Sequence, residues 1–216
     1  MPTLCMHMEI ANRCKDLLNI KNLDDFLFGV LYPDFSEDEN GIKRDMMHYY
    51  IPYEYSNIRY NASPLPNVMH FIIDNKDFIE KDFYKGYLVH LISDYVFNEF
   101  DNMRIGTSVI YMTKDGVEKQ TDRKREDFII CGNNYECKYN VVYSQLSTYV
   151  RDIINNDFDL LLADILLRIE ELNNYLLIDS SNRDTKLYAY EDYEILFCWC
   201  VQLVSYYKDI IEWRYL

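Results

Sequence analysis

The segment of residues 77–100, DFIEKDFYKGYLVHLISDYVFNEF, constrains the fold of this chain more than any other. Its apolar residues recur at the three- and four-residue spacing of an α-helix, and His90 and Asp94 lie close to the same stripe as Phe83. A stripe of this kind faces the interior of a protein. Burying an ionised carboxylate without a partner is costly, so this helix requires a metal ion or a charged group beside it.

Helical spacing recurs along the rest of the chain. It predicts further helices at residues 4–18, 23–31, 123–130, 137–155, 157–176 and 188–214. The Tyr32-Pro33 pair is expected to end the second of these helices and to leave Asp34 on a turn. His48 is expected on a short helix or at its start.

Two stretches break the helical pattern. The prolines between residues 52 and 67 predict an irregular crossing. Alternating residues around Asp115-Gly116 suggest a small β-hairpin at residues 107–120. We therefore expect an all-α fold with a small β-hairpin insertion. A single domain over residues 1–216 is expected, because a chain of this length suits one domain or at most two small ones.

The chain is acidic, with a formal net charge of -14 at pH 7 and a pI of about 4.6. This charge repels phosphates at long range, so it argues against general binding to nucleic acid and against docking on an anionic membrane. No apolar stretch reaches the roughly 18 residues of a transmembrane helix, and the start of the chain lacks the pattern of a signal peptide. A cytoplasmic location is expected, and the six cysteines are interpreted as free thiols.

Metal-binding residue types gather in the first half of the chain. The chain has four histidines, and none follows His90. His90 and Asp94 are four residues apart, so on a helix their side chains are neighbours and one ion can take both. Zinc accepts imidazole nitrogen and carboxylate oxygen but needs three or four donors. His7, Asp34 and His48 add donors of the right type, within about 90 residues.

Each of these residues taken alone also has an ordinary explanation. A histidine–aspartate pair on a helix is more often a structural hydrogen bond, His7 suits a core histidine, and Asp34 suits a turn or a helix cap. The fourth histidine, His70, has no motif around it and is placed outside the site. Tyr49 and Tyr95 flank two of the donors and are candidates for the pocket wall, although packing explains them equally well.

Four stretches in the first 100 residues share their order and spacing with a known family. They are T-x-x-x-H-x-x-I-A at residues 3–11, FLFGVLYPDF at 26–35, HYYIP at 48–52 and GYLVHLISDY at 86–95. With these motifs the chain resembles the zinc-dependent phospholipase C and S1/P1-type nuclease family, in particular its small bacterial cytosolic members. The resemblance covers less than half of the chain. It implies a multi-helix bundle of the phospholipase C/P1 nuclease type.

The resemblance also implies a set of metal ligands. The positions that match the family's ligands are His7, Asp34, His48, His90 and Asp94, and the last of these is able to bridge two ions. Secreted members hold a further zinc with a downstream histidine pair and a glutamate. Because no histidine follows His90, that further ion is expected to be absent or bound otherwise.

These residues predict a metal-dependent hydrolase of phosphoesters, with one or two zinc ions or another divalent metal and a small phosphoester as substrate. Asp34 is the expected catalytic residue, as a ligand that orients or deprotonates the attacking water. The alternative is a non-catalytic relative that holds one structural ion or none and acts as an interaction protein. An HD-type phosphohydrolase ranks last, because no histidine is followed by an aspartate. The long C-terminal helix is a candidate interface for a homo-oligomer.

Overall fold

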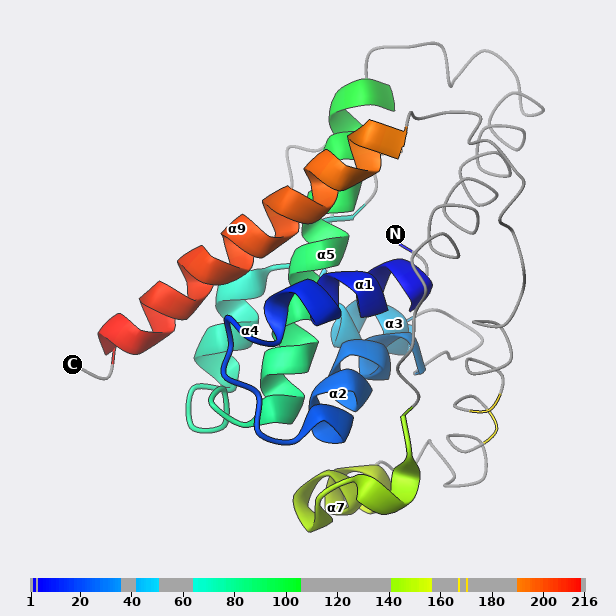
Figure 1. The fold of residues 1–216 in the computed structure, drawn as a ribbon, viewed down its shortest axis with the longest axis vertical. Helices are drawn as coiled ribbons and strands as arrows, with labels where there is room; N and C mark the ends of the chain where they lie inside the picture. Colours follow the sequence, from blue (N-terminus) through cyan, green and yellow to red (C-terminus); the bar gives the residue numbers. More distant parts are fainter. Residues whose placement is uncertain are drawn as a thin grey trace.

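Helix α5, Asp82–Ile105, runs through the centre of the molecule, and other helices pack around it (Figure 1). The computed structural model describes residues 2, 4–35, 42–50, 64–105, 141–156, 167, 170 and 190–214. Within these residues the structure is helical, and the one extended pairing is an isolated antiparallel bridge between Tyr50 and Pro66. The all-α fold class is confirmed for this part of the chain, and the phospholipase C/P1 nuclease type of bundle stays a prediction.

The elements follow one another in a simple order. They are α1 (Leu4–Cys14), α2 (Leu23–Phe35), α3 (Ile42–Met47), α4 (Val68–Asp74), α5, a 3-10 turn η2 (Tyr143–Gln145), α7 (Thr148–Asn156) and α9 (Tyr190–Arg214). Polar side chains cap three of these helices, because each accepts a hydrogen bond from the backbone N–H three residues later. The caps are Asn22 at α2, Asn67 at α4 and Ser147 at α7.

Helices α2 and α5 approach each other so closely that the crossing requires glycine. A Cβ atom at Gly86 would overlap the carbonyl oxygen of Phe26, and a Cβ atom at Gly29 would overlap the carbonyl oxygen of Phe83. One glycine on each helix thus lets the two backbones touch. The crossing fixes the position of α2 along the length of α5. Both helices carry candidate site residues.

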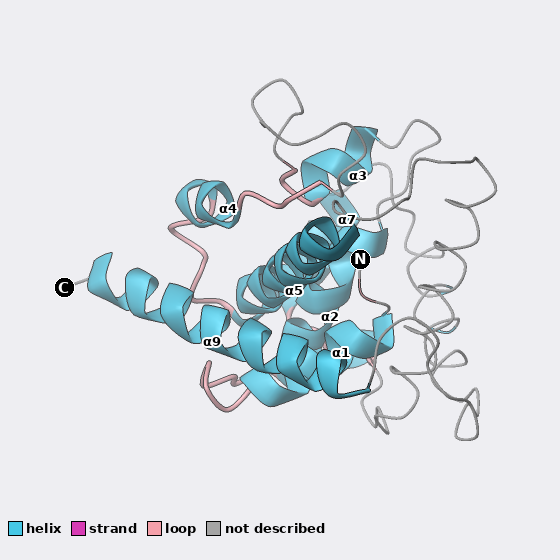
Figure 2. Ribbon diagram, turned by 90° about the horizontal axis from the view of Figure 1, so that it is seen from above, coloured by secondary structure: helices cyan, strands magenta, loops and turns pink. Residues whose placement is uncertain are grey.

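Aromatic side chains fill the space around α5, and Figure 2 looks along this helix with α1, α2, α4 and α9 around it. Phe83 of α5 packs against Phe28 and Tyr32 of α2. Further along α5, Phe97 packs against Phe197 of α9. Full burial of a large apolar side chain stabilises a fold by about 1.5–3 kcal/mol, so these contacts hold the bundle together.

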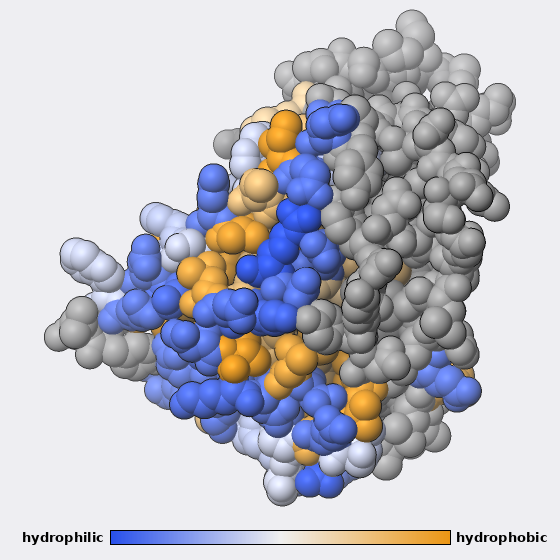
Figure 3. Space-filling view, viewed as in Figure 1, coloured by the Kyte–Doolittle hydropathy of each residue, from blue (hydrophilic) through white to orange (hydrophobic). Residues whose placement is uncertain are grey.

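Helix α9 lies diagonally across α1 and α5 (Figure 1). The guanidinium of Arg13 on α1 donates to both carboxylate oxygens of Glu194 on α9, at 2.8 and 3.0 Å. Figure 3 shows hydrophobic side chains along the diagonal of α9, beside a band of hydrophilic ones. Large apolar residues of α9 that remain 46% exposed or more are Ile195, Trp199, Tyr206 and Trp213. Association of copies through this helix stays a prediction.

The end of α2 differs from the sequence-based expectation. Helix α2 continues through Pro33 to Phe35, so Asp34 lies on the helix and the predicted turn is wrong. Proline removes only one backbone donor in the last turn of a helix. The packing of α2 along α5 outweighs this loss.

Other expected elements also shift. Within the described part of the expected helix at 137–155, the structure has the 3-10 turn Tyr143–Gln145 and then α7, which begins only at Thr148. Residues 15–19 form turns, so α1 ends at Cys14 rather than at residue 18. Residues 75–80 form turns as well, and α5 begins at Asp82 rather than at residue 77. His48 follows α3 directly and lies at its C-terminal end, not at its start. The C-terminal helix is confirmed, at Tyr190–Arg214.

Several expectations fall outside the described residues. They are the β-hairpin at 107–120, the helix at 123–130, nearly all of the helix at 157–176 and most of the irregular crossing at 52–67. The single domain over residues 1–216 also stays a prediction. None of the described helices is both long and apolar enough to cross a membrane.

Replacing Gly86 with alanine is expected to destabilise the fold, because the new methyl group would overlap the backbone of α2. Overpacking costs about 1–3 kcal/mol, and we expect the upper end here because a backbone oxygen cannot swing aside as a side chain does. Urea denaturation measures the effect, with Met103→Ala on the exposed side of the same helix as the control. Equal stabilities of the two variants would show that α2 and α5 can separate without loss.

Candidate metal centre

Five polar side chains from four parts of the chain converge beside α5. His7 comes from α1, Asp34 from α2, His48 from the turn after α3, and His90 and Asp94 from α5. His7, His90 and Asp94 form one group whose ligand atoms all lie within 4.8 Å of one another. Asp34, His48 and His90 form a second such group. The residues that the sequence singles out are thus neighbours, and their role as metal ligands stays a prediction.

Backbone carbonyls orient two of the histidine rings. Nδ1 of His90 lies 2.7 Å from the carbonyl oxygen of Val30, and Nδ1 of His48 lies 2.8 Å from that of Arg44. A carbonyl only accepts, so each Nδ1 carries the proton that it donates. Each Nε2 then faces the cluster. Metal-binding histidines are commonly held by a second hydrogen bond of this kind.

Several pairs of facing atoms in the cluster lie as far apart as neighbouring ligands of a metal ion. The Nε2 atoms of His48 and His90 lie 3.2 Å apart, and Nε2 of His48 lies 3.3 Å from Oδ1 of Asp34. Nε2 of His7 lies 3.5 Å from Oδ1 of Asp94. Oδ2 of Asp94 lies 3.6 Å from His48 and 3.7 Å from His90.

These distances fit a zinc-sized ion. Zinc binds imidazole nitrogen and carboxylate oxygen at about 2.0–2.2 Å in a tetrahedral arrangement, which places neighbouring ligand atoms roughly 3.3–3.5 Å apart. The five distances between facing atoms, from 3.2 to 3.7 Å, bracket that range. Both the donor types and their spacing are therefore suitable for a divalent cation.

Burial leaves several atoms of the cluster unsatisfied. His7, His48, His90 and Asp94 have no exposed surface, whereas 22% of the Asp34 side chain is exposed. Both ring nitrogens of His7 and Oδ1 of Asp94 have no hydrogen-bond partner among the described residues. A buried polar group without a partner costs about 1–3 kcal/mol, so such groups call for an explanation. A cation bound by these atoms would satisfy them.

The electrostatics of the cluster favour charged carboxylates and a neutral His90. Burial, followed by the proximity of His7, lowers the pKa of His90 to about 3. Burial by itself raises the pKa of Asp34, but His90 and the hydrogen bond with His48 outweigh it, and the pKa falls to about 2. The same balance between burial and the histidines lowers the pKa of Asp94. At neutral pH the cluster presents two carboxylates, which is the form that a cation binds.

Two further polar residues, which the sequence-based site did not include, lie next to the candidate ligands in space or along α5. The hydroxyl oxygen of Tyr50 lies 3.5 Å from Oδ2 of Asp94. Asn98, four residues after Asp94 on α5, is buried and donates from Nδ2 to the carbonyl of Pro64 at 2.8 Å. Its Oδ1 has no hydrogen-bond partner among the described residues. Helical spacing from Asp94 could have found Asn98, whereas nothing in the sequence separates Tyr50 from Tyr49.

Residues near the cluster in sequence are not all near it in space. Tyr49, a candidate for the pocket wall, packs its ring against His70 and Phe71 instead. His70 itself is exposed and lies 3.4 Å from Asp74, outside the cluster as expected. Tyr95 is partly buried against the hydrophobic core. None of these three belongs to either group of ligand atoms.

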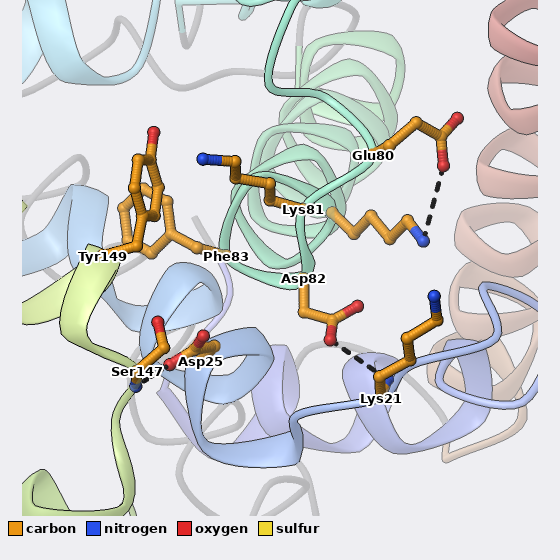
Figure 4. A pocket seen from close by; sticks show the side chains of 9 residues that line it. Lys21, Asp25, Glu80, Lys81, Asp82, Phe83, Ser147 and Tyr149 are labelled. Carbon is orange, nitrogen blue, oxygen red and sulfur yellow. Dashed lines mark hydrogen bonds and ion pairs between the residues drawn. The ribbon is translucent and has the colours of Figure 1, made fainter.

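A separate cavity of about 360 Å³ lies near the start of α5 (Figure 4). Two of its three carboxylates accept backbone hydrogen bonds: Asp82 from the N–H of Lys21 at 3.0 Å, and Asp25 from the N–H of Ser147 at 2.8 Å. The third, Glu80, lies 3.6 Å from Nζ of Lys85. None of the five candidate ligands lines this cavity. The cavity is therefore distinct from the candidate metal centre. Asp82 joins the start of α5 to the segment before α2, and Asp25 joins α2 to the start of α7.

No family model, curated protein or solved structure matches this chain. The fold and the site together define a helical protein with a buried cluster of three histidines and two aspartates. The resemblance to the phospholipase C and S1/P1 nuclease family stays a prediction from motifs.

Replacing His7 with leucine is expected to destabilise the metal-free protein less than the same change at His90, because both ring nitrogens of His7 are buried without a hydrogen bond. His90→Leu is the matched comparison. It also removes a buried ring, but it leaves the Val30 carbonyl without its hydrogen bond and should destabilise. Urea unfolding of both variants in chelator measures the difference. An equal loss of stability in both would contradict the view that His7 is unsatisfied.

Metal binding is expected to weaken as pH falls. Burial lowers the pKa of His48, but its hydrogen bond with Asp34 and the charge of Asp94 outweigh burial and raise the pKa above its ordinary value. Below that raised pKa, Nε2 carries a proton that an ion must displace; above it, the ring is neutral and binds freely. Zinc affinity measured from about pH 6 to about pH 8.5 should therefore rise with pH. An affinity that stays constant over this range would contradict His48 as a ligand.

Proposed function

We propose that this chain is a metal-dependent hydrolase of phosphoesters. The proposal rests on the convergence of three imidazoles and two carboxylates. Some of their buried atoms have no hydrogen-bond partner among the described residues. Mixtures of histidine and carboxylate suit zinc, iron or manganese, and zinc is the metal that the motifs imply. The resemblance to zinc-dependent phospholipases and nucleases points to the same chemistry.

The two groups of donors suit one or two ions. His7 and His90 belong to one group, and Asp34 and His48 belong to the other, which also includes His90. Oδ1 of Asp94 faces His7, and Oδ2 faces His48 and His90, so its carboxylate has a neighbour in each group. A divalent ion held there supplies a Lewis acid that polarises a phosphoryl oxygen and lowers the pKa of water to near neutrality.

Asp34 is the donor placed to meet the substrate. Part of its side chain is exposed, whereas the other four donors are closed off from solvent. Its pKa of about 2 makes it a poor proton acceptor at neutral pH, because an effective general base has a pKa near the working pH. Asp34 is therefore suited to orienting an attacking water by accepting its hydrogen bond, rather than to removing its proton.

The positive charge of a metal-loaded centre would let an acidic protein bind a phosphoester. The net charge of -14 repels phosphate at a distance. Asp34 and Asp94 supply two negative charges, fewer than the positive charges of two divalent ions, so a loaded centre is locally positive. Attraction of a phosphoryl group is thus expected to depend on bound metal.

One observation favours a second candidate, a structural metal site. Four of the five donors have no exposed surface. Structural zinc sites are closed, whereas catalytic sites keep an open position for water or substrate. In that case the chain is non-catalytic and acts through its surface, for which the exposed side of α9 is a candidate.

Elemental analysis of protein purified without chelator tests the metal centre. We expect one or two equivalents of zinc or another divalent metal in the wild-type chain and none in His90→Ala. His70→Ala is the matched control, because His70 is exposed and lies outside the cluster, and it should keep the wild-type metal content. Circular dichroism of each variant verifies the fold.

Hydrolysis of p-nitrophenyl phosphate and bis(p-nitrophenyl) phosphate by the same proteins separates the two candidates. A hydrolase predicts metal-dependent turnover of a phosphoester by the wild type and by His70→Ala, lost in His90→Ala. Bound metal without turnover of these compounds or of a wider phosphoester panel supports the structural site. A folded wild-type chain that holds no metal contradicts both metal-binding candidates and leaves the non-catalytic relative that holds no ion.

A further inference from the structure

The side chain of Tyr50 reaches the metal centre without being one of its candidate ligands. Its ring stacks on that of His48, with the ring centroids 5.1 Å apart and the planes at 23°. Its hydroxyl oxygen lies 3.5 Å from Oδ2 of Asp94. Tyr50 thus contacts a candidate histidine with the face of its ring and a candidate carboxylate with its hydroxyl.

Backbone contacts hold Tyr50 in this place. Its N–H donates to the carbonyl of Asp45 at 3.1 Å, and the residue pairs with Pro66 in the antiparallel bridge. Tyr49 before it has a φ of 51°, a left-handed conformation that costs a non-glycine residue roughly 1–2 kcal/mol. With this turn, Tyr49 packs against His70 while Tyr50 faces the cluster. Strain beside a site is retained where surrounding contacts enforce it.

The orientation of Asp94 decides which histidines its two carboxylate oxygens face. Its Oδ1 faces His7, and its Oδ2 faces His48 and His90. Rotation of the carboxylate would move both oxygens away from these partners at once. Apart from the candidate ligands, the Tyr50 hydroxyl is the one hydrogen-bond donor among the described residues that reaches either oxygen.

We infer that Tyr50 is a positioning residue of the metal centre: its hydroxyl holds the Asp94 carboxylate so that Oδ1 faces His7 while Oδ2 faces His48 and His90. The inference rests on the metal centre of the proposed function and adds a residue that is not a ligand. A phenol keeps its proton at neutral pH and so acts as a donor to the carboxylate. Loss of such an outer hydrogen bond lowers metal affinity by about 10–100-fold.

Two adjacent tyrosines provide a matched pair of variants. Tyr50→Phe removes the hydroxyl that faces Asp94 and keeps the ring that stacks on His48. Tyr49→Phe removes a hydroxyl one residue away, which accepts a hydrogen bond from Nδ2 of Asn75 at 3.2 Å. Asn75 keeps its other hydrogen bond, so this control costs little. If the Tyr50 hydroxyl served only packing, the two variants would bind metal alike.

Zinc affinity tests the inference, measured on metal-stripped protein by competition with a chromophoric chelator. We expect Tyr50→Phe to weaken zinc binding by about 10-fold or more, and Tyr49→Phe to stay within roughly 2-fold of the wild type. Thermal unfolding of the stripped proteins shows whether both variants are folded. Equal zinc affinities of Tyr50→Phe and Tyr49→Phe would overturn the inference.

The outcomes for the inference and for the proposed function are distinct. A wild-type chain that binds zinc but hydrolyses no phosphoester overturns the proposed function, while a weaker affinity of Tyr50→Phe still supports the positioning role. A wild-type chain that hydrolyses phosphoesters, together with an unchanged affinity of Tyr50→Phe, overturns the positioning role alone. A wild-type chain that binds neither zinc nor another divalent metal overturns both.

Discussion

The close crossing of α2 and α5 is the constraint on which the rest of the structure depends. Gly29 and Gly86 let the two backbones touch. At the same crossing, the carbonyl of Val30 on α2 meets Nδ1 of His90 on α5 and orients the ring. With α2 held in this position along α5, Oδ1 of Asp34 near the end of α2 lies 3.3 Å from Nε2 of His48. One packing contact therefore closes the core and also places candidate ligands from two helices.

The polar cluster conflicts with the apolar core that surrounds it. Phe28, Leu91 and Phe97 are buried in the same core as the unsatisfied nitrogens of His7 and Oδ1 of Asp94. Apolar side chains of similar size would pack there at lower cost. Local conflict of this kind is expected where function, rather than stability, selects the residues. The left-handed backbone beside the cluster is a second instance, since a non-glycine residue adopts it only under constraint.

Helix positions were largely predictable, because periodicity is a property of neighbouring residues. The pattern around His90 and Asp94 placed both on a buried helix, and both are fully buried in α5. Pro33 misled the prediction of the end of α2, because a proline signals the loss of one backbone donor. The compensating contacts with α5 come from residues far away in the sequence.

For the site, local sequence decides which donors exist and which of them are helical neighbours. His90 and Asp94 are such neighbours whatever the rest of the fold does, because spacing along one helix sets their distance. Their meeting with His7, Asp34 and His48 depends on how four separate segments cross, and crossing angles arise from packed surfaces. Tyr50, and not Tyr49, contacts Asp94 because the backbone of Tyr49 is left-handed. The surrounding contacts enforce this conformation, which the side chain of Tyr49 disfavours.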